Sequence, residues 1–185
     1  MILQQALDVD YDFDIANSNL NYANELISAL AWMQDNKMTA IPNVDKFYPY
    51  DNLEKQYAAK YLADFAKKII KKNPNKKVIC NFSDLKRADK NMWGSIIEAC
   101  QLGLLAWDKG KFSPSSDVTH EEFINAVGKL IYWDQKDYYS KAQEERLLQD
   151  LDADGYLQKD DPINRGDAAI LLYRAYDTTL PNHID

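Results

Sequence analysis

Residues 150–161, DLDADGYLQKDD, place acidic side chains at the intervals that a calcium-binding loop uses. Six positions fit this spacing: Asp150, Asp152, Asp154, Gly155, Tyr156 and Asp161. The carboxylates and the backbone carbonyl of the tyrosine are hard oxygen ligands of the kind that Ca²⁺ prefers, and the glycine stands where such a loop turns sharply. The segment therefore predicts a calcium site, with an acidic turn between two helices as the alternative.

Three basic or potentially basic side chains each follow an apolar residue by two positions. The pairs are Leu53 with Lys55, Val118 with His120, and Ile163 with Arg165. If these side chains bind an anionic ligand, arginine suits it best, because lysine lacks its bidentate fork and histidine side chains are mostly neutral at pH 7. We therefore expect unequal sites and favour the one at Arg165.

Six segments carry apolar residues at helical spacing and must position these side chains. They are residues 20–35, 52–72, 91–105, 119–133, 138–151 and 163–176. Thr119 precedes Glu122, and Asn164 precedes Asp167, by the three residues of a capping box, which supports two of the helix starts. No segment alternates convincingly between apolar and polar residues, so the sequence predicts an all-α fold.

The six helices form three pairs whose loops share their content. In the first two pairs an aromatic residue stands two positions before a proline, as Phe47 before Pro49 and Phe112 before Pro114, and the third loop departs from this pattern. The loops therefore indicate a degenerate internal repeat. A helix pair of this size cannot bury its own apolar face, so we expect the pairs to pack together, most simply around a pseudo-threefold axis, with an open solenoid as the alternative.

Composition and charge argue against several classes of protein. The 185 residues are 46% hydrophobic and 28% charged, as in an ordinary globular protein. The formal net charge is −7, and the sequence has no evident basic patch of the size of a groove. Nucleic acid is therefore not an expected partner. No run reaches the roughly 18 apolar residues of a membrane span, and the N-terminal stretch lacks the basic region of a signal peptide.

The second repeat resembles an S-layer homology (SLH) repeat. The family pattern is Phe-x-Asp, an aromatic residue at a helix start, a glycine-bearing turn, a Phe-x-Pro loop and a Thr-Arg-x-Glu helix start. The matching residues here are Phe82, Asp84, Trp93, Gly103, Gly110, Phe112, Pro114, Thr119 and Glu122. The start of the first repeat and PINRGDAAILLYRA in the third are also similar to the family, so the likeness extends over nearly the whole chain.

The resemblance implies a single module over residues 1–185, with repeats at 11–72, 80–133 and 134–178. It also implies a bacterial cell-surface protein that binds an acidic, often pyruvylated, cell-wall polysaccharide in grooves between repeats and is attached to a larger surface protein or layer. The expected glycan-binding residues are Arg165, Asn164, Asp167, His120, Thr119, Lys55, Trp93 and Asp84. Only Arg165 keeps the arginine of the Thr-Arg-x-Glu motif, since Lys55 and His120 replace it elsewhere.

The two cysteines, Cys80 and Cys100, stand at the start of the second repeat and late in its first helix, where the chain could bring them together. Two buried thiols are the alternative to a bond. Because the resemblance implies an oxidising location, we expect a disulfide.

The sequence gives little support to catalysis, because it has two histidines, His120 and His183, and no phosphate loop, serine elbow or histidine metal cluster. We expect a protein that is not an enzyme. The main alternative function is a calcium-dependent protein-interaction module built on residues 150–161, whose final Asp161 is more similar to a dockerin loop than to an EF-hand. Another alternative is an assembly protein that keeps the SLH scaffold without its glycan grooves.

Overall fold

The computed structural model describes residues 20–41, 43–132, 137–144, 146–149, 151 and 158–179. Within these residues the regular structure is helical, and strand pairing is limited to four isolated β-bridges. The all-α prediction is confirmed. None of the helices in this part of the chain is long and apolar enough to cross a membrane.

Each of the six predicted helices is present, most of them shorter than expected. The first covers residues 20–35. The others are α3 (Lys55–Lys68), α4 (Trp93–Gln101), α5 (His120–Ile131), α6 (Tyr138–Glu144) and α7 (Arg165–Thr179). Three short elements were not predicted: α2 (Val44–Phe47), η1 (Leu85–Arg87) and η2 (Lys90–Met92).

Local interactions set several helix ends. Thr119 and Glu122 form the expected capping box at the start of α5. At the end of α4 the backbone turns through Gly103, whose φ of +69° suits glycine. The N–H of Gly103 donates to the carbonyl of Cys100, and the N–H of Leu104 donates to that of Ala99. These two bonds satisfy carbonyls that the helix itself leaves open.

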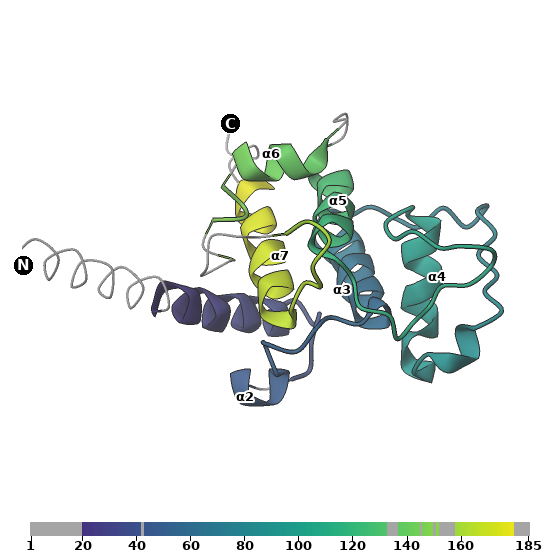
Figure 1. Ribbon diagram of the computed structural model, residues 1–185, viewed down its shortest axis with the longest axis horizontal. Coiled ribbons are helices and arrows are strands. Elements are labelled where there is room, and N and C mark those ends of the chain that lie inside the picture. The colour runs from purple at the N-terminus through teal and green to yellow at the C-terminus, as the bar shows by residue number, and fades with distance from the viewer. Residues whose placement is uncertain are drawn as a thin grey trace, which may run out of the picture.

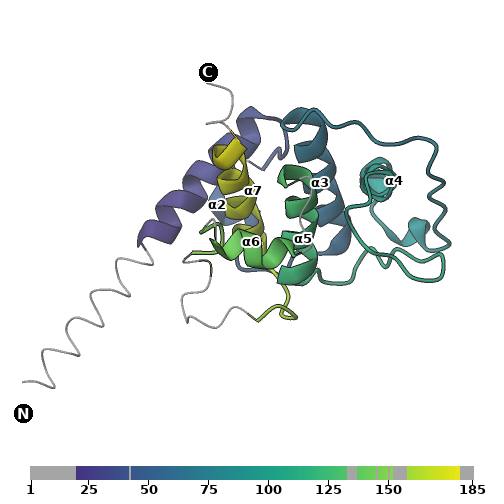
Figure 2. The same ribbon diagram turned by 90° about the horizontal axis from the view of Figure 1, so that it is seen from above.

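The helices α3, α5 and α7 lie next to one another in the middle of the molecule (Figures 1 and 2). Each packs against the first helix of another pair: α3 against α4, α5 against α6, and α7 against the helix over residues 20–35. Trp32, for example, contacts the rings of Tyr173 and Tyr176 in α7. Because the second helix of each pair packs against the first helix of another pair, the apolar faces of the helices are buried in one shared core.

The segment around α4 forms a lobe on the outer side of α3 (Figures 1 and 2). We define this α4 lobe as residues 71–111. The sulfur atoms of Cys80 and Cys100 are 2.09 Å apart, so the predicted disulfide joins the lobe's first loop to the last turn of α4.

Candidate functional site

The three predicted apolar positions meet at the centre of the molecule. The N–H of Leu53 donates to the carbonyl of Ile163 at 2.9 Å, that of Ile163 donates to Val118 at 2.9 Å, and that of Val118 donates to Leu53 at 3.0 Å. All three side chains are fully buried. The three loop-to-helix segments therefore close a ring of backbone hydrogen bonds.

The basic residues two positions later each bond to the loop of a different pair. The N–H of Lys55 donates to Ser116, that of His120 to Asp161 and that of Arg165 to Asp51, over 2.8–3.0 Å between nitrogen and carbonyl oxygen. The next residue along the chain repeats the pattern in each case. The three predicted side chains therefore lie at three separate junctions, each between one pair of helices and another.

Arg165 lies at the start of α7, against aromatic rings of the first pair. Its guanidinium carbon is 4.9 Å from the ring centre of Phe47 and 5.8 Å from that of Tyr57. The buried phenol of Tyr61 lies near the same side chain. Burial raises the pKa of Tyr61, and the nearby positive charge of Arg165 opposes that rise. The guanidinium thus lies among aromatic side chains of the first pair.

The charge of Arg165 has no ion-pair partner among the described residues. The side chain is half-buried, and its Nε atom is buried without a hydrogen-bond partner. A cation held partly out of water without a counter-charge is unfavourable, so the junction favours a ligand that brings an anion.

Two exposed tyrosines border this junction. Tyr48 is 60% exposed and Tyr50 is 78% exposed, on either side of buried Pro49. The carbonyl of Pro49 accepts from the N–H of Gly166, which fixes the loop against the start of α7. A Cβ atom at Gly166 would come within 2.6 Å of the hydroxyl of Tyr22, so only glycine allows this close approach.

The junction at Lys55 is more enclosed. The Nζ atom lies 5.4 Å from the ring centre of Phe112, and the side chain is 8% exposed. This arrangement parallels that of Arg165 on Phe47, since each cation lies on the phenylalanine of another pair's Phe-x-Pro loop. Its burial leaves less of the cation accessible to a ligand from solvent.

The junction at His120 contains an internal carboxylate. The Nδ1 atom is 3.0 Å from the carbonyl oxygen of Asp161 and must donate to it, and Nε2 is 3.7 Å from Oδ2 of Asp167. The buried carboxylate of Asp167 also accepts from the hydroxyl of Tyr22 and from the side-chain amide of Asn164. His120, Asn164 and Asp167, all predicted site residues, are therefore brought together, but beside an anion of the protein itself.

The other predicted glycan residues lie elsewhere. Thr119 caps α5, and Trp93 lies half-buried at the start of α4 with its indole N–H 3.3 Å from the carbonyl of Ala88. Asp84 is 9% exposed and accepts from the N–H groups of Phe112 and Ser113 at 2.9 and 2.8 Å. Burial opposes ionisation of Asp84, but these donors outweigh it and lower the pKa of Asp84 below its usual value.

Most of the predicted calcium loop, including Asp150, Asp152, Asp154 and Tyr156, lies outside the described residues. Asp161 is described and exposed, and its carbonyl accepts from the backbone and ring of His120. The calcium site stays a prediction.

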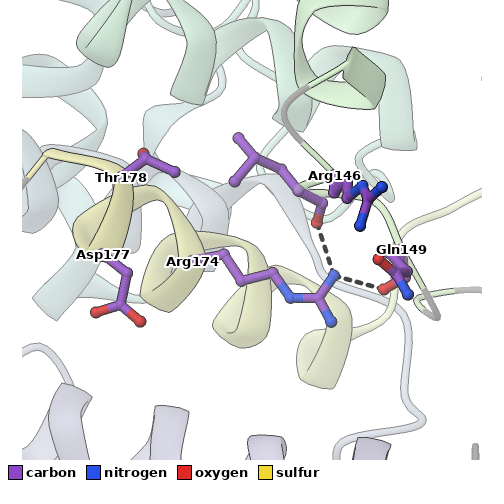
Figure 3. A pocket seen from close by; sticks show the side chains of 6 residues that line it. Arg146, Gln149, Arg174, Asp177 and Thr178 are labelled. Carbon is purple, nitrogen blue, oxygen red and sulfur yellow. Dashed lines mark hydrogen bonds between the residues drawn. The ribbon is translucent and has the colours of Figure 1, made fainter.

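A surface pocket of about 320 Å³ lies between residues 146–149 and the end of α7 (Figure 3). Its central side chain, Arg174, donates to the carbonyls of Leu147 and Gln149 and forms two bonds with the carboxylate of Glu25. These partners take up four of the five N–H groups of the guanidinium. Arg174 therefore links the helix over residues 20–35 to α7, and its charge is already paired with that of Glu25.

Sequence reasoning missed the residues that complete the junctions. Tyr22 contacts Asp167 and Tyr57 contacts Arg165 only through the fold, and tyrosine at helical spacing is more typical of core. The sequence FYPY at residues 47–50 could have indicated exposed tyrosines, because two tyrosines next to a turn proline are seldom both buried.

No protein-family model matches this chain, and no curated protein matches it.

Proposed function

We propose that the chain is a three-repeat module of the SLH type, with its helix pairs related by a pseudo-threefold axis. Support comes from the cyclic order of the backbone bonds, in which Leu53 donates to Ile163, Ile163 to Val118 and Val118 to Leu53. The bonds at the basic positions close a second ring that runs in the opposite direction, from Lys55 to Ser116, from His120 to Asp161 and from Arg165 to Asp51. An open solenoid would leave its first and last repeats unpaired.

We further propose that the module is not an enzyme and binds an acidic, pyruvylated cell-wall polysaccharide at the bacterial cell surface, where it holds a larger protein or layer. The observation that carries this proposal is the half-buried guanidinium of Arg165, which lies over Phe47 without a described carboxylate partner. An acidic sugar substituent supplies the missing charge through charge-assisted hydrogen bonds.

The surroundings of Arg165 suit the rest of such a ligand. Tyr48 and Tyr50 are exposed on either side of Pro49, which bonds to the start of α7, and they offer the flat apolar surface and hydroxyl groups that a sugar ring requires. The Lys55 junction is more buried, and the His120 junction already contains Asp167. One strong site at Arg165 therefore fits better than three equal sites.

Isothermal titration with purified wall polysaccharide fragments tests the proposal. We expect binding of the pyruvylated fragment, little binding of the pyruvate-free fragment, and affinity lower by about 10- to 150-fold in Arg165→Ala, equivalent to about 1.5–3 kcal/mol for a charge-assisted contact. Lys37→Ala, at an exposed position outside residues 71–111, is the control. Equal binding of both fragments would disprove the role of Arg165, and absence of binding would favour a module that interacts with proteins.

A further inference from the structure

The α4 lobe has a charge opposite to that of the whole protein. Its 41 residues include nine Lys and Arg and four Asp and Glu, whereas the whole chain has a net charge of −7. Of the four acidic groups, Glu98 pairs with Lys67, and Asp84 is buried with its carboxylate bonded to the N–H groups of Phe112 and Ser113. No basic patch was expected from the sequence. The lobe differs from that expectation, because the acidic rest of the chain conceals its positive charge in the net charge.

Exposed apolar side chains lie among these lysines. Ile79 is 86% exposed and Val78 is 40% exposed, directly after Lys76 and Lys77. Trp107 is 51% exposed, and Lys109 and Lys111 follow it closely, with Asp108 as the one acidic residue among them. A large aliphatic side chain exposed to this extent is unfavourable in water, so its position beside cations favours a partner that is both anionic and apolar.

The fold holds the two apolar groups on one rigid lobe. The disulfide fixes Cys80, next to Ile79, to α4. Trp107 packs edge-on against Phe82 with ring centres 5.7 Å apart, and the N–H of Ser83 donates to the carbonyl of Gly110. The lobe as a whole lies on the far side of α3 from α7 (Figures 1 and 2).

We propose that the α4 lobe docks on the surface of an anionic lipid bilayer. Its lysines attract the anionic headgroups, while Ile79, Val78 and Trp107 enter the headgroup region, where tryptophan in particular is favoured. A soluble polyanion would account for the lysines but not for the exposed aliphatic groups. This surface is separate from Arg165 and does not depend on glycan binding.

Vesicle co-sedimentation tests this proposal, with phosphatidylcholine vesicles and with vesicles that also contain 30% phosphatidylglycerol. We expect binding only to the anionic vesicles. Lys76→Gln with Lys77→Gln should weaken it about 30-fold, since each lysine near such a surface contributes about 1 kcal/mol. The control pair Lys37→Gln with Lys46→Gln removes the same charge from exposed positions outside the lobe and should have little effect.

The pair Ile79→Ser with Trp107→Ser separates a bilayer from a soluble polyanion. This double variant should weaken vesicle binding several-fold and leave any binding of inorganic polyphosphate unchanged. The control, Ile27→Ser, at a residue 57% exposed outside the lobe, should leave both vesicle binding and polyphosphate binding unchanged. Vesicle binding that is absent, or that survives loss of both apolar groups, would overturn the proposal. In the second case the lobe would be a general polyanion site.

Discussion

The hydroxyl of Tyr22 donates to the carboxylate of Asp167 over 2.8 Å, although the two residues are 145 positions apart. Tyr22 belongs to the first helix and Asp167 to the first turn of α7, so this bond joins the first helix pair to the last. Burial and the neighbouring carboxylate raise the pKa of Tyr22 well above its usual value. The bond therefore stabilises the neutral phenol.

Replacing Tyr22 with phenylalanine should lower the free energy of unfolding by about 1.5–3 kcal/mol, because a buried carboxylate loses a donor. Since the folded pKa is raised, the contribution of Tyr22 is present below about pH 10 and is lost as the pH rises further. Urea unfolding at pH 7 and at pH 10.5 measures both effects. Tyr50→Phe, at a position 78% exposed, is the control, and equal stability of the two variants would contradict the role of Tyr22.

Asp84 should make the protein sensitive to acid. Its lowered folded pKa means that its contribution is present above about pH 4, its value in the unfolded chain, and is lost as the pH falls through the folded value. Asp84→Asn should reduce stability at pH 7 by about 1–3 kcal/mol and flatten the decline below pH 4. Unfolding curves from pH 2 to 7 test this, with exposed Asp108→Asn as the comparison. An unchanged acid decline in Asp84→Asn would refute it.

The disulfide should contribute about 3 kcal/mol, because Cys80 and Cys100 close a loop of 20 residues in the unfolded chain. Changing both cysteines to serine, or reducing them with dithiothreitol, should lower the free energy of unfolding by that amount. Guanidinium unfolding of both forms gives the value. A change below about 1 kcal/mol would mean that the lobe is stable without the bond.

Two helical glycines should respond in opposite directions to alanine. A Cβ atom at Gly128 in α5 would lie 2.5 Å from Cβ of Tyr138 in α6, whereas one at Gly94 in α4 meets no atom within 4 Å. Gly128→Ala should cost about 1–3 kcal/mol through overpacking, and Gly94→Ala should stabilise by up to about 1 kcal/mol. Thermal unfolding of both variants checks the sign. Equal changes in melting temperature for the two variants would show that α5 and α6 pack less closely than the distance between Gly128 and Tyr138 indicates.

The helices were predictable because apolar spacing and the caps at Thr119 and Asn164 are local signals. The equivalence of Leu53, Val118 and Ile163 was also visible in the loops. Their ring of hydrogen bonds was not, since the register between distant loops depends on the packing of α3, α5 and α7. For the same reason the sequence could not tell that Asp167 lies beside His120 and that Arg165 has no such partner among the residues that the structure describes. A local count of charges would have revealed the basic α4 lobe, which the net charge conceals.

The most direct test of the proposed function is a cycle that pairs loss of Arg165 with loss of the acidic substituent of the ligand. Titrations would measure the affinities of wild type and Arg165→Ala for a pyruvylated wall fragment and for its pyruvate-free counterpart. If the guanidinium binds the acidic substituent, loss of Arg165 alone or of the substituent alone should weaken binding, and loss of both should weaken it little further. The coupling energy between the two groups should then be about 1.5–3 kcal/mol. Effects that add to within about 0.5 kcal/mol would contradict the assignment.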